Sequence, residues 1–221
     1  MTSDSGMNET LKVCEFFTSI QGESSYAGLP CVFIRLTGCN LRCNYCDTRY
    51  AYTEGTDMSV ADLLDKVQGT HIRLVELTGG EPLIQSATPV LIDALVDMGL
   101  RTLIETNGSI NIGHFNRSAV FIVDLKAPSS GMVDHNDLSN LKALSPTDEV
   151  KIVLGNRDDY RWASELIARY RLTQRCHVLL SPVAGVLQAE TLAAWILQDA
   201  LEVRLNLQLH KYIYGTDRRM V

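Results

Sequence analysis

The chain has 221 residues, of which 46% are hydrophobic and 21% charged, and it carries a formal net charge of -6 at pH 7. This composition is typical of one globular domain with a substantial core, and an acidic balance without a basic run disfavours a nucleic-acid partner. No apolar run is long enough to cross a membrane, and residues 1–12 lack the pattern of a secretion signal, so we expect a cytoplasmic protein.

Residues 1–12 are polar and rich in Ser, Asp, Asn and Thr, which predicts a disordered lead-in before a single domain of residues 13–221. Short apolar runs rich in β-branched residues then predict strands that are buried on both faces. These runs are Val32–Leu36, Leu74–Leu77, Thr102–Glu105, Val120–Leu125, Val150–Leu154, Val178–Leu180 and Val203–Leu207.

Helical spacing between these runs predicts the intervening helices. Their residues are Val60–Val67 after a cap at Ser59 and Asp62, Val90–Met98, Leu138–Leu144, Tyr160–Tyr170 and Glu190–Leu197. Regular alternation of strand and helix requires parallel strands with right-handed crossovers. We therefore predict an α/β fold, a full or partial (β/α) barrel of roughly six parallel strands with outer helices.

Polar segments follow four consecutive predicted strands. They are Thr37–Asp47, Thr78–Pro82, Thr106–Gly108 and Ala127–Gly131. Because the carboxyl ends of parallel strands meet at one edge of a sheet or barrel, these segments are predicted to line one binding site.

The first of these segments contains Cys39, Cys43 and Cys46 in the spacing C-x3-C-x2-C. Structural zinc normally takes four ligands and no fourth Cys or His lies near, whereas three thiolates on a 4Fe-4S cube leave one iron open to a ligand. A zinc knot or a chance cluster of cysteines is the alternative. Cys14, Cys31 and Cys176 lie in apolar runs and are interpreted as buried hydrophobes.

The spacing, with the aromatic Tyr45 before the last cysteine, resembles the signature of the radical S-adenosylmethionine (SAM) superfamily. The resemblance implies that the open iron binds SAM and that the reduced cluster cleaves it to a 5′-deoxyadenosyl radical, so no catalytic side chain is expected. Thr78-Gly-Gly-Glu-Pro82 is similar to the superfamily's Gly-Gly-Glu-Pro motif. The implied SAM-binding residues are Tyr45, Cys46, Asp47, Gly80, Glu81, Glu105, Asp124, Leu125, Lys126 and Ser129, with Gly79 less firmly implied.

Four further segments narrow the resemblance to the 7-carboxy-7-deazaguanine synthase family. They are Glu15–Glu23, Gly28–Arg35, Cys46–Thr48 and Gln208–Tyr212. The implied reaction converts 6-carboxy-5,6,7,8-tetrahydropterin to 7-carboxy-7-deazaguanine with loss of ammonia, in 7-deazapurine (queuosine) biosynthesis. The family also implies Mg2+, an electron donor such as flavodoxin, and a homodimer.

Gln21 and Glu23 suit the amide-like edge of a pterin, and Arg35 suits its carboxylate, because a guanidinium forms a two-pronged contact with a carboxylate. The implied substrate-binding residues are Ile20, Gln21, Gly22, Glu23, Arg35, Thr78 and His210, and the implied Mg2+ ligand is Thr48. The alternative is a loop surface at Gln21 and Glu23, a solvated charge at Arg35 and a helix cap at Thr48.

The sequence departs from the family pattern at two places, which affects the assignment of the family's residue roles to this chain. Ser24 stands where a second glycine is usual after Gln-Gly-Glu, so a different local backbone is possible there. Nine residues follow Tyr212, which argues against a substrate contact by the chain end. The alternative functions are a glycyl-radical activating enzyme that acts on a protein partner, and a non-enzymatic iron-sulfur carrier or zinc scaffold.

Overall fold

The structure is a computed structural model that describes residues 4–215 and 218–221. Its strands are β1 (Thr10–Ile20), β2 (Pro30–Leu36), β3 (Thr56–Ser59), β4 (Leu74–Gly79), β5 (Arg101–Thr106), β6 (Val120–Lys126), β7 (Glu149–Leu154), β8 (His177–Pro182) and β9 (Arg204–Leu205). Its α-helices are α1 (Asp4–Met7), α2 (Val60–Thr70), α3 (Thr88–Asp97), α4 (Asn140–Ala143), α5 (Arg157–Tyr170), α6 (Ala189–Gln198) and α7 (Leu209–Tyr214). Short 3-10 helices include η1 (Arg49–Tyr52), η2 (Pro82–Ile84) and η4 (Pro128–Ser130).

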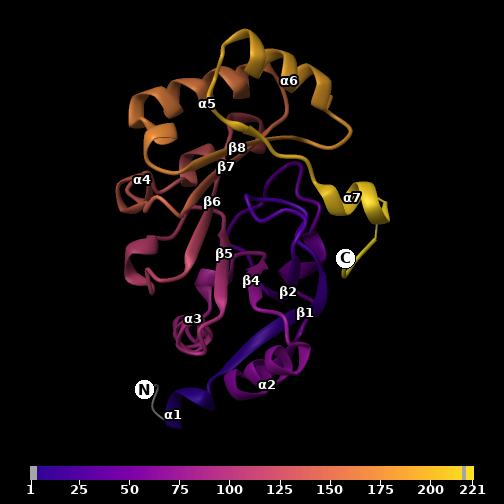
Figure 1. Cartoon of the computed structure of the whole chain (residues 1–221), viewed down its shortest axis with the longest axis vertical. Helices are drawn as coiled ribbons and strands as arrows, with labels where there is room; N and C mark the ends of the chain where they lie inside the picture. Colours follow the sequence, from indigo (N-terminus) through magenta and orange to yellow (C-terminus); the bar gives the residue numbers. More distant parts are fainter. Residues whose placement is uncertain (1–3, 216–217) are drawn as a thin grey trace.

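The described strands form one sheet in the order β3-β1-β2-β4-β5-β6-β7-β8-β9. From β2 to β9 every neighbouring pair is parallel. The sheet curves, does not close, and carries its helices on the outside (Figure 1). The predicted partial (β/α) barrel is therefore confirmed, with seven parallel strands in place of roughly six.

The amino-terminal region differs from its prediction. Strand β1 begins at Thr10, within the predicted disordered lead-in, and pairs antiparallel with both β2 and β3. Leu11 and Val13 are buried on one face of β1, which is the period-two pattern of a strand packed on a core. Helix α1 covers Asp4–Met7, and residues 1–3 lie outside the described residues.

Two apolar cores lie on opposite faces of the sheet. The larger core fills the space between the sheet and the outer helices, and residues such as Leu77, Val123 and Ile152 belong to it. Helix α2 begins where the sequence predicts, since the Ser59 hydroxyl accepts a 3.0 Å hydrogen bond from the Asp62 amide.

The smaller core lies on the inner face. It contains Phe17, Cys31, Phe33, Leu74, Leu103, Val120 and Ile122. Side chains alternate along a strand, so residues two and four positions further on share this face. These positions include Arg35, Glu76, Glu105 and Asp124, so the inner face changes from apolar to charged toward the carboxyl ends of the strands.

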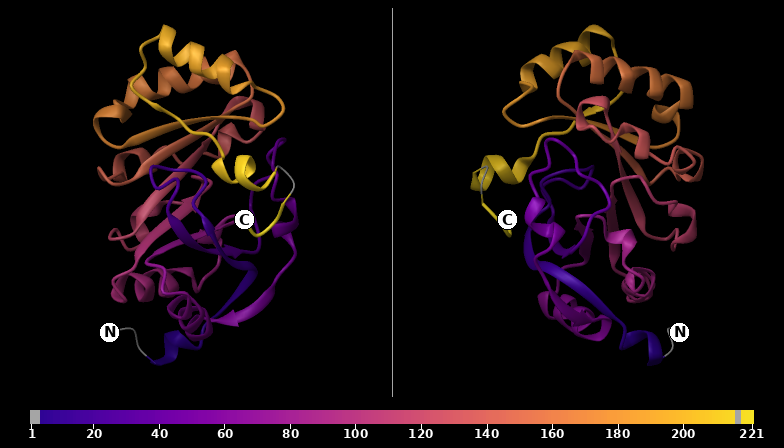
Figure 2. Two further views of the ribbon diagram at one scale, coloured as in Figure 1. Left: turned by 45° about the vertical axis from the view of Figure 1, so that its right-hand side comes forward. Right: turned by 180° about the vertical axis from the view of Figure 1, so that it is seen from behind.

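The carboxyl-terminal segment crosses from the β9 end of the sheet to the opposite end. Figure 2 shows α7 beside the amino-terminal strands, far from α6, which precedes it in the sequence. The amide of Leu209 donates a 2.8 Å hydrogen bond to the carbonyl of Gly22. This segment therefore bridges the two edges of the open barrel. In the described part of the chain, no helix combines the length and the apolar character that crossing a membrane requires.

Candidate active site

A cavity of about 320 Å³ opens at the carboxyl ends of the parallel strands. Most residues that the sequence predicts for the site line it. They are Ile20, Gln21, Gly22, Glu23, Arg35, Cys39, Cys43, Tyr45, Cys46, Asp47, Thr48, Thr78, Gly79, Gly80, Glu105, Asp124, Lys126 and His210. Three of the four polar segments predicted to converge contribute residues to this cavity, whereas no residue of Ala127–Gly131 lines it.

The three cysteines come from the loop that follows β2, and all three thiols are free and partly exposed. The Leu41 amide lies 3.4 Å from the Cys39 sulfur and the Asn107 side-chain nitrogen lies 3.8 Å from it. Burial raises the pKa of the Cys39 and Cys43 thiols, so binding of iron would release their protons. Donors that face a sulfur favour its thiolate form, so this loop fits a cluster held by three cysteines.

No three His, Cys, Asp or Glu side chains in residues 4–215 and 218–221 converge closely enough to hold a single metal ion. The three thiols instead share one cavity wall.

The Gly-Gly-Glu-Pro segment after β4 packs directly on the cysteine loop. The amide of Gly80 donates to the Leu36 carbonyl at 3.2 Å, and the amide of Glu81 donates to the Gly38 carbonyl at 2.8 Å. A Cβ atom on Gly80 would lie 2.8 Å from the Cβ atom of Cys39, closer than real contacts allow. The second glycine is therefore required by the close approach of these two loops, in addition to any ligand.

Glu81, to which the resemblance assigns SAM binding, is fully buried and does not line the cavity, and its role toward SAM stays a prediction. Its carboxylate accepts hydrogen bonds from the Leu83 amide (3.0 Å), the Thr106 hydroxyl (2.9 Å) and the Asn107 amide (2.6 Å). The side chain thus joins the loop after β4 to the loop after β5. It acts on the cavity by positioning Asn107, which contacts Cys39.

Glu81 gives the protein a specific pH dependence. Burial raises the pKa of Glu81 to about 7, although its three donors act in the opposite direction. The pKa in the unfolded chain is about 4.3, so the folded state retains a proton that the unfolded chain has lost, and stability falls as pH rises from about 4 to 7. This loss of stability is on the order of 3 kcal/mol, and we expect Glu81→Gln to remove it. Denaturant unfolding at pH 5 and pH 7.5 measures it, and equal slopes in both proteins would contradict the assignment.

Two further residues assigned to SAM are also not in the cavity. Leu125 is fully buried in the larger core, because its position in β6 faces the outer helices. The hydroxyl of Ser129 is hydrogen-bonded to Asp159, and the Ser129 amide donates to the same carboxylate at 2.9 Å. The side chains of Leu125 and Ser129 thus lie outside the cavity, and binding of SAM by these residues stays a prediction.

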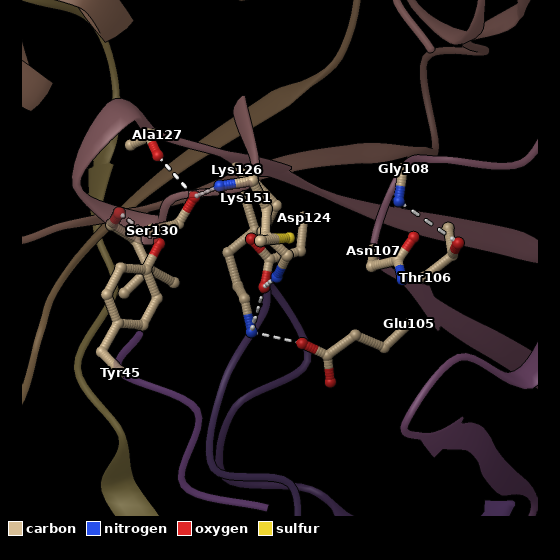
Figure 3. A network of polar contacts seen from close by, with 12 residues as sticks. Tyr45, Glu105, Thr106, Asn107, Gly108, Asp124, Lys126, Ala127, Ser130 and Lys151 are labelled. Atoms are coloured by element: carbon tan, nitrogen blue, oxygen red, sulfur yellow. Dashed lines mark hydrogen bonds and ion pairs between the residues drawn. The ribbon is translucent and has the colours of Figure 1, made fainter. Parts of the chain in front are cut away.

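Lys151 on β7 lies at the centre of the charged residues on the inner face of the sheet, and it was not predicted from the sequence. Its ammonium forms ion pairs with Glu23 (2.9 Å), with Glu105, and with Asp124 (3.8 Å), whose carboxylate also pairs with Lys126 at 2.9 Å. Figure 3 shows Asp124, Lys151 and Glu105 pointing toward one another. One oxygen of Asp124 is buried without a partner among the described residues, which suits a donor from a ligand.

Glu76 is a second missed residue, on the inner face of β4. It is buried, lines the cavity and accepts a hydrogen bond from the Gln21 side chain. Burial raises the pKa of Glu76 well above the usual range, with Glu105 and Glu23 acting in the same direction, which favours the neutral form of this carboxyl. The available signal was a charged residue inside a predicted apolar run, Glu76 in Leu74–Leu77 and Lys151 in Val150–Leu154.

The Gln-Gly-Glu segment packs against α7. Glu23 accepts a 2.9 Å hydrogen bond from Gln208, and burial would raise its pKa, but Lys151 and this bond lower the pKa to about 2. A Cβ atom on Gly22 would overlap the imidazole ring of His210 and lie 2.9 Å from the backbone nitrogen of His210, so only glycine fits there. The segment Gln208–Tyr212 therefore contacts the Gln-Gly-Glu segment, and His210 lines the cavity. The backbone at Ser24 adopts φ 64°, which is the conformation that the family's glycine favours.

Arg35 and Thr48 lie on the β1 side of the cavity. The Arg35 Nε donates to Glu15 at 2.9 Å. The Thr48 hydroxyl donates to Asp47 at 3.0 Å, and Asp47 pairs with Lys211 at 2.8 Å. Asp47 therefore connects the end of the cysteine loop to α7, while Thr48 keeps an oxygen lone pair for a ligand.

Comparison with known proteins adds independent support. Residues 33–118 match the Radical SAM superfamily. The chain is 44% identical over 214 residues to a 7-carboxy-7-deazaguanine synthase of Chlorobaculum tepidum, covering 96% of this chain and 97% of that protein. It is 39% identical to the Koribacter versatilis protein of the same name, covering 96% and 100%. The crystal structure of QueE from Escherichia coli superposes with a TM-score of 0.79 at 26% identity, covering 95% and 100%.

Proposed function

Because this chain belongs to the 7-carboxy-7-deazaguanine synthase family of radical SAM enzymes, we propose that it converts 6-carboxy-5,6,7,8-tetrahydropterin to 7-carboxy-7-deazaguanine with loss of ammonia. The observation that carries the proposal is the single cavity that holds both residue sets. The three cysteines line it together with Gln21, Glu23, Arg35 and Thr78. The product belongs to 7-deazapurine biosynthesis.

The family implies a 4Fe-4S cluster and SAM, which together supply a 5′-deoxyadenosyl radical when bound. Cys39, Cys43 and Cys46 would hold the cluster. The backbone of Gly79 and Gly80 faces the cavity beside Cys39 and offers carbonyls to the amino group of SAM. The unpartnered oxygen of Asp124 can accept a hydrogen bond from a ribose hydroxyl, and Lys126 holds the other oxygen in place.

The substrate would lie on the β1 side of these groups. Gln21 is held at both ends, because its oxygen accepts the Glu23 amide at 3.0 Å and its nitrogen donates to Glu76. It can therefore present one free donor and one free acceptor in a fixed orientation to the pterin ring. Arg35 would bind the substrate carboxylate, and His210 on α7 would close this end of the cavity.

The proposed reaction is tested by incubating anaerobically reconstituted protein with SAM, a reductant and the carboxytetrahydropterin. Formation of 7-carboxy-7-deazaguanine is expected, and its absence from protein with a full cluster would refute the proposal. The two near-full-length relatives disfavour a glycyl-radical activating enzyme, which shares the cysteine spacing. Purified protein with stoichiometric zinc and no iron would indicate a scaffold instead.

Thr48 is proposed as a ligand of Mg2+ together with the substrate carboxylate, since this ion prefers oxygen ligands. Thr48 lines the cavity, and its hydroxyl donates a hydrogen bond to Asp47, which leaves the lone pairs of the hydroxyl oxygen free to bind the ion. We expect Thr48→Ala to lose most of the Mg2+ stimulation of turnover, about tenfold, because one of few protein ligands is removed. Turnover is measured with and without Mg2+, and the cluster spectrum is the control. Loss of the cluster in this variant would contradict the assignment.

Three features of the working protein are also proposed. An electron donor such as flavodoxin reduces the cluster, since the reaction starts from a reduced centre. The protein is a homodimer, and several large apolar side chains near the carboxyl terminus, including Leu207 and Ile213, are exposed and available for an interface. It acts in the cytoplasm, where its thiols stay reduced.

A further inference from the structure

The last four residues return to the active site after α7. Val221 lines the cavity, whereas the sequence argued against a contact by the chain end. The guanidinium of Arg219 lies 3.7 Å from the centre of the Tyr50 ring and pairs with Glu54 at 3.0 Å. Both partners follow the cysteine loop directly. The end of the chain is therefore attached beside the site by one arginine.

Arg219 also reaches a buried carboxylate on β1. Its Nε donates to one oxygen of Glu15 at 2.9 Å, while the Nε of Arg35 donates to the other oxygen at the same distance. The hydroxyl of Tyr50 adds a 3.2 Å bond to the oxygen that Arg35 uses. The Glu15 side chain is 2% exposed, so water does not compete for it. Glu15 thus joins the two arginines in a rigid bridge.

This bridge determines how Arg35 can act. The bond to Glu15 uses only Nε, so the two terminal nitrogens of Arg35 remain for the cavity that it lines. With Glu15 alone, Arg35 would form a neutral pair and could turn its terminal nitrogens toward that carboxylate. Arg219 occupies the second oxygen, so Glu15 holds Arg35 by one edge only. Because Glu54 pairs with Arg219 at 3.0 Å, Arg35, Glu15, Arg219 and Glu54 carry no net charge together. What the bridge sets is therefore the orientation of Arg35.

We propose that Arg219 is a positioning residue: by holding Glu15, it fixes the orientation of Arg35 for the carboxylate of the substrate. This inference rests on the proposed function, which assigns the carboxylate to Arg35. It adds a residue near the carboxyl terminus that does not itself line the cavity. The same contacts would arise if Arg219 only anchored the chain end, so the test must separate these two roles.

The test measures binding of two ligands to holoenzyme with SAM: carboxytetrahydropterin and the tetrahydropterin that lacks the carboxylate. We expect Arg219→Ala to weaken binding of the carboxylated ligand about tenfold, as removal of groups that orient ligand-binding side chains does at metal sites. Binding of the other ligand should be unchanged. KM should rise with little change in kcat, and Arg219→Lys should recover part of the loss. Arg218→Ala is the matched control, since Arg218 stacks on Tyr214 at 5.9 Å, a contact that does not involve Glu15.

A second measurement tests whether Arg219 acts through Arg35. In an Arg35→Ala background, Arg219→Ala should cause no further loss of affinity for the carboxylated ligand. If Arg219→Ala weakens the binding of both ligands equally, or if the losses add in the double variant, Arg219 only anchors the chain end and the proposal is overturned. If Arg219→Ala does not fold, the same ligand comparison on Arg219→Lys decides. Failure of the wild-type protein to form a deazapurine would refute the proposed reaction, whereas the ligand comparison tests Arg219 by binding only.

Discussion

Replacing Lys151 with methionine is expected to abolish turnover and to lower the free energy of unfolding by about 3 to 5 kcal/mol, the range seen when one partner of a buried ion pair is removed. The ammonium pairs with Glu23, Glu105 and Asp124. Methionine keeps the volume and flexibility of the side chain but leaves three carboxylates facing one another. They would separate or take up protons, and the inner surface of the cavity would change shape.

The pH dependence of this loss identifies its cause. With Lys151 present, the pKa of Glu23 lies at about 2, below its value of about 4.3 in an unfolded chain. The resulting stability is therefore present above about pH 4 and lost as pH falls toward 2. Wild type and Lys151→Met should differ most at pH 6 to 7 and approach each other below pH 4. Denaturant unfolding over this range measures the difference.

Lys142→Met is the matched control, since Lys142 is exposed on α4. It should change stability by no more than about 0.5 kcal/mol, as is usual for surface substitutions. A loss in Lys151→Met that stayed constant from pH 7 to pH 3 would mean that packing, and not charge, is responsible.

The fold could largely be predicted from the sequence because its strands are buried on both faces. Runs such as Val120–Leu125 and Val150–Leu154 contain enough β-branched and apolar residues to identify a parallel sheet without further context. Strand β1 was missed because the charged residues Lys12 and Glu15 interrupt its sequence. The segment therefore does not have the continuous apolar run that identifies the other strands. Its antiparallel pairing is also not predicted by the alternation of strands and helices, which predicts only the parallel strands.

The site could be predicted only where a motif or a neighbouring sequence signal existed. The cysteine loop, Gln21, Arg35 and His210 were identified in this way, and all line the cavity. Glu76 and Lys151 have no motif, and their role comes from partners 55 and 128 residues away, at Gln21 and Glu23 respectively. Such long-range charge pairs are set by strand order, which local patterns do not encode.

The two glycines of the Gly-Gly-Glu-Pro segment show a related limit. Sequence reasoning explained them by the approach of a ligand to the backbone. The structure adds that Gly79 has φ 150° and that a Cβ on it would lie 2.8 Å from the Leu36 amide nitrogen. The same residues therefore serve chain packing, and their substitution should act before any ligand binds.

Gly80→Ala is accordingly expected to prevent assembly of the cluster site. The added methyl group would lie 2.8 Å from the Cβ atom of Cys39 and against the Gly38 backbone, neither of which is the movable end of a side chain. The cysteine loop would have to move away from the loop after β4, breaking the 2.8 Å bond from the Glu81 amide to Gly38. We expect a destabilisation of about 3 kcal/mol, at the upper end for overpacking. Iron content after reconstitution should fall well below that of wild type.

Gly69→Ala provides the matched control, because Gly69 lies in α2 and a Cβ there meets nothing within 4 Å. Alanine at a helical site of this kind should stabilise the protein by about 0.5 to 1 kcal/mol and leave iron content unchanged. Iron and sulfide analysis with thermal unfolding of both variants compares the two glycines directly. Full iron incorporation by Gly80→Ala would show that the cysteine loop adjusts to the added methyl group, and the contact between the two loops would then not be what positions Cys39.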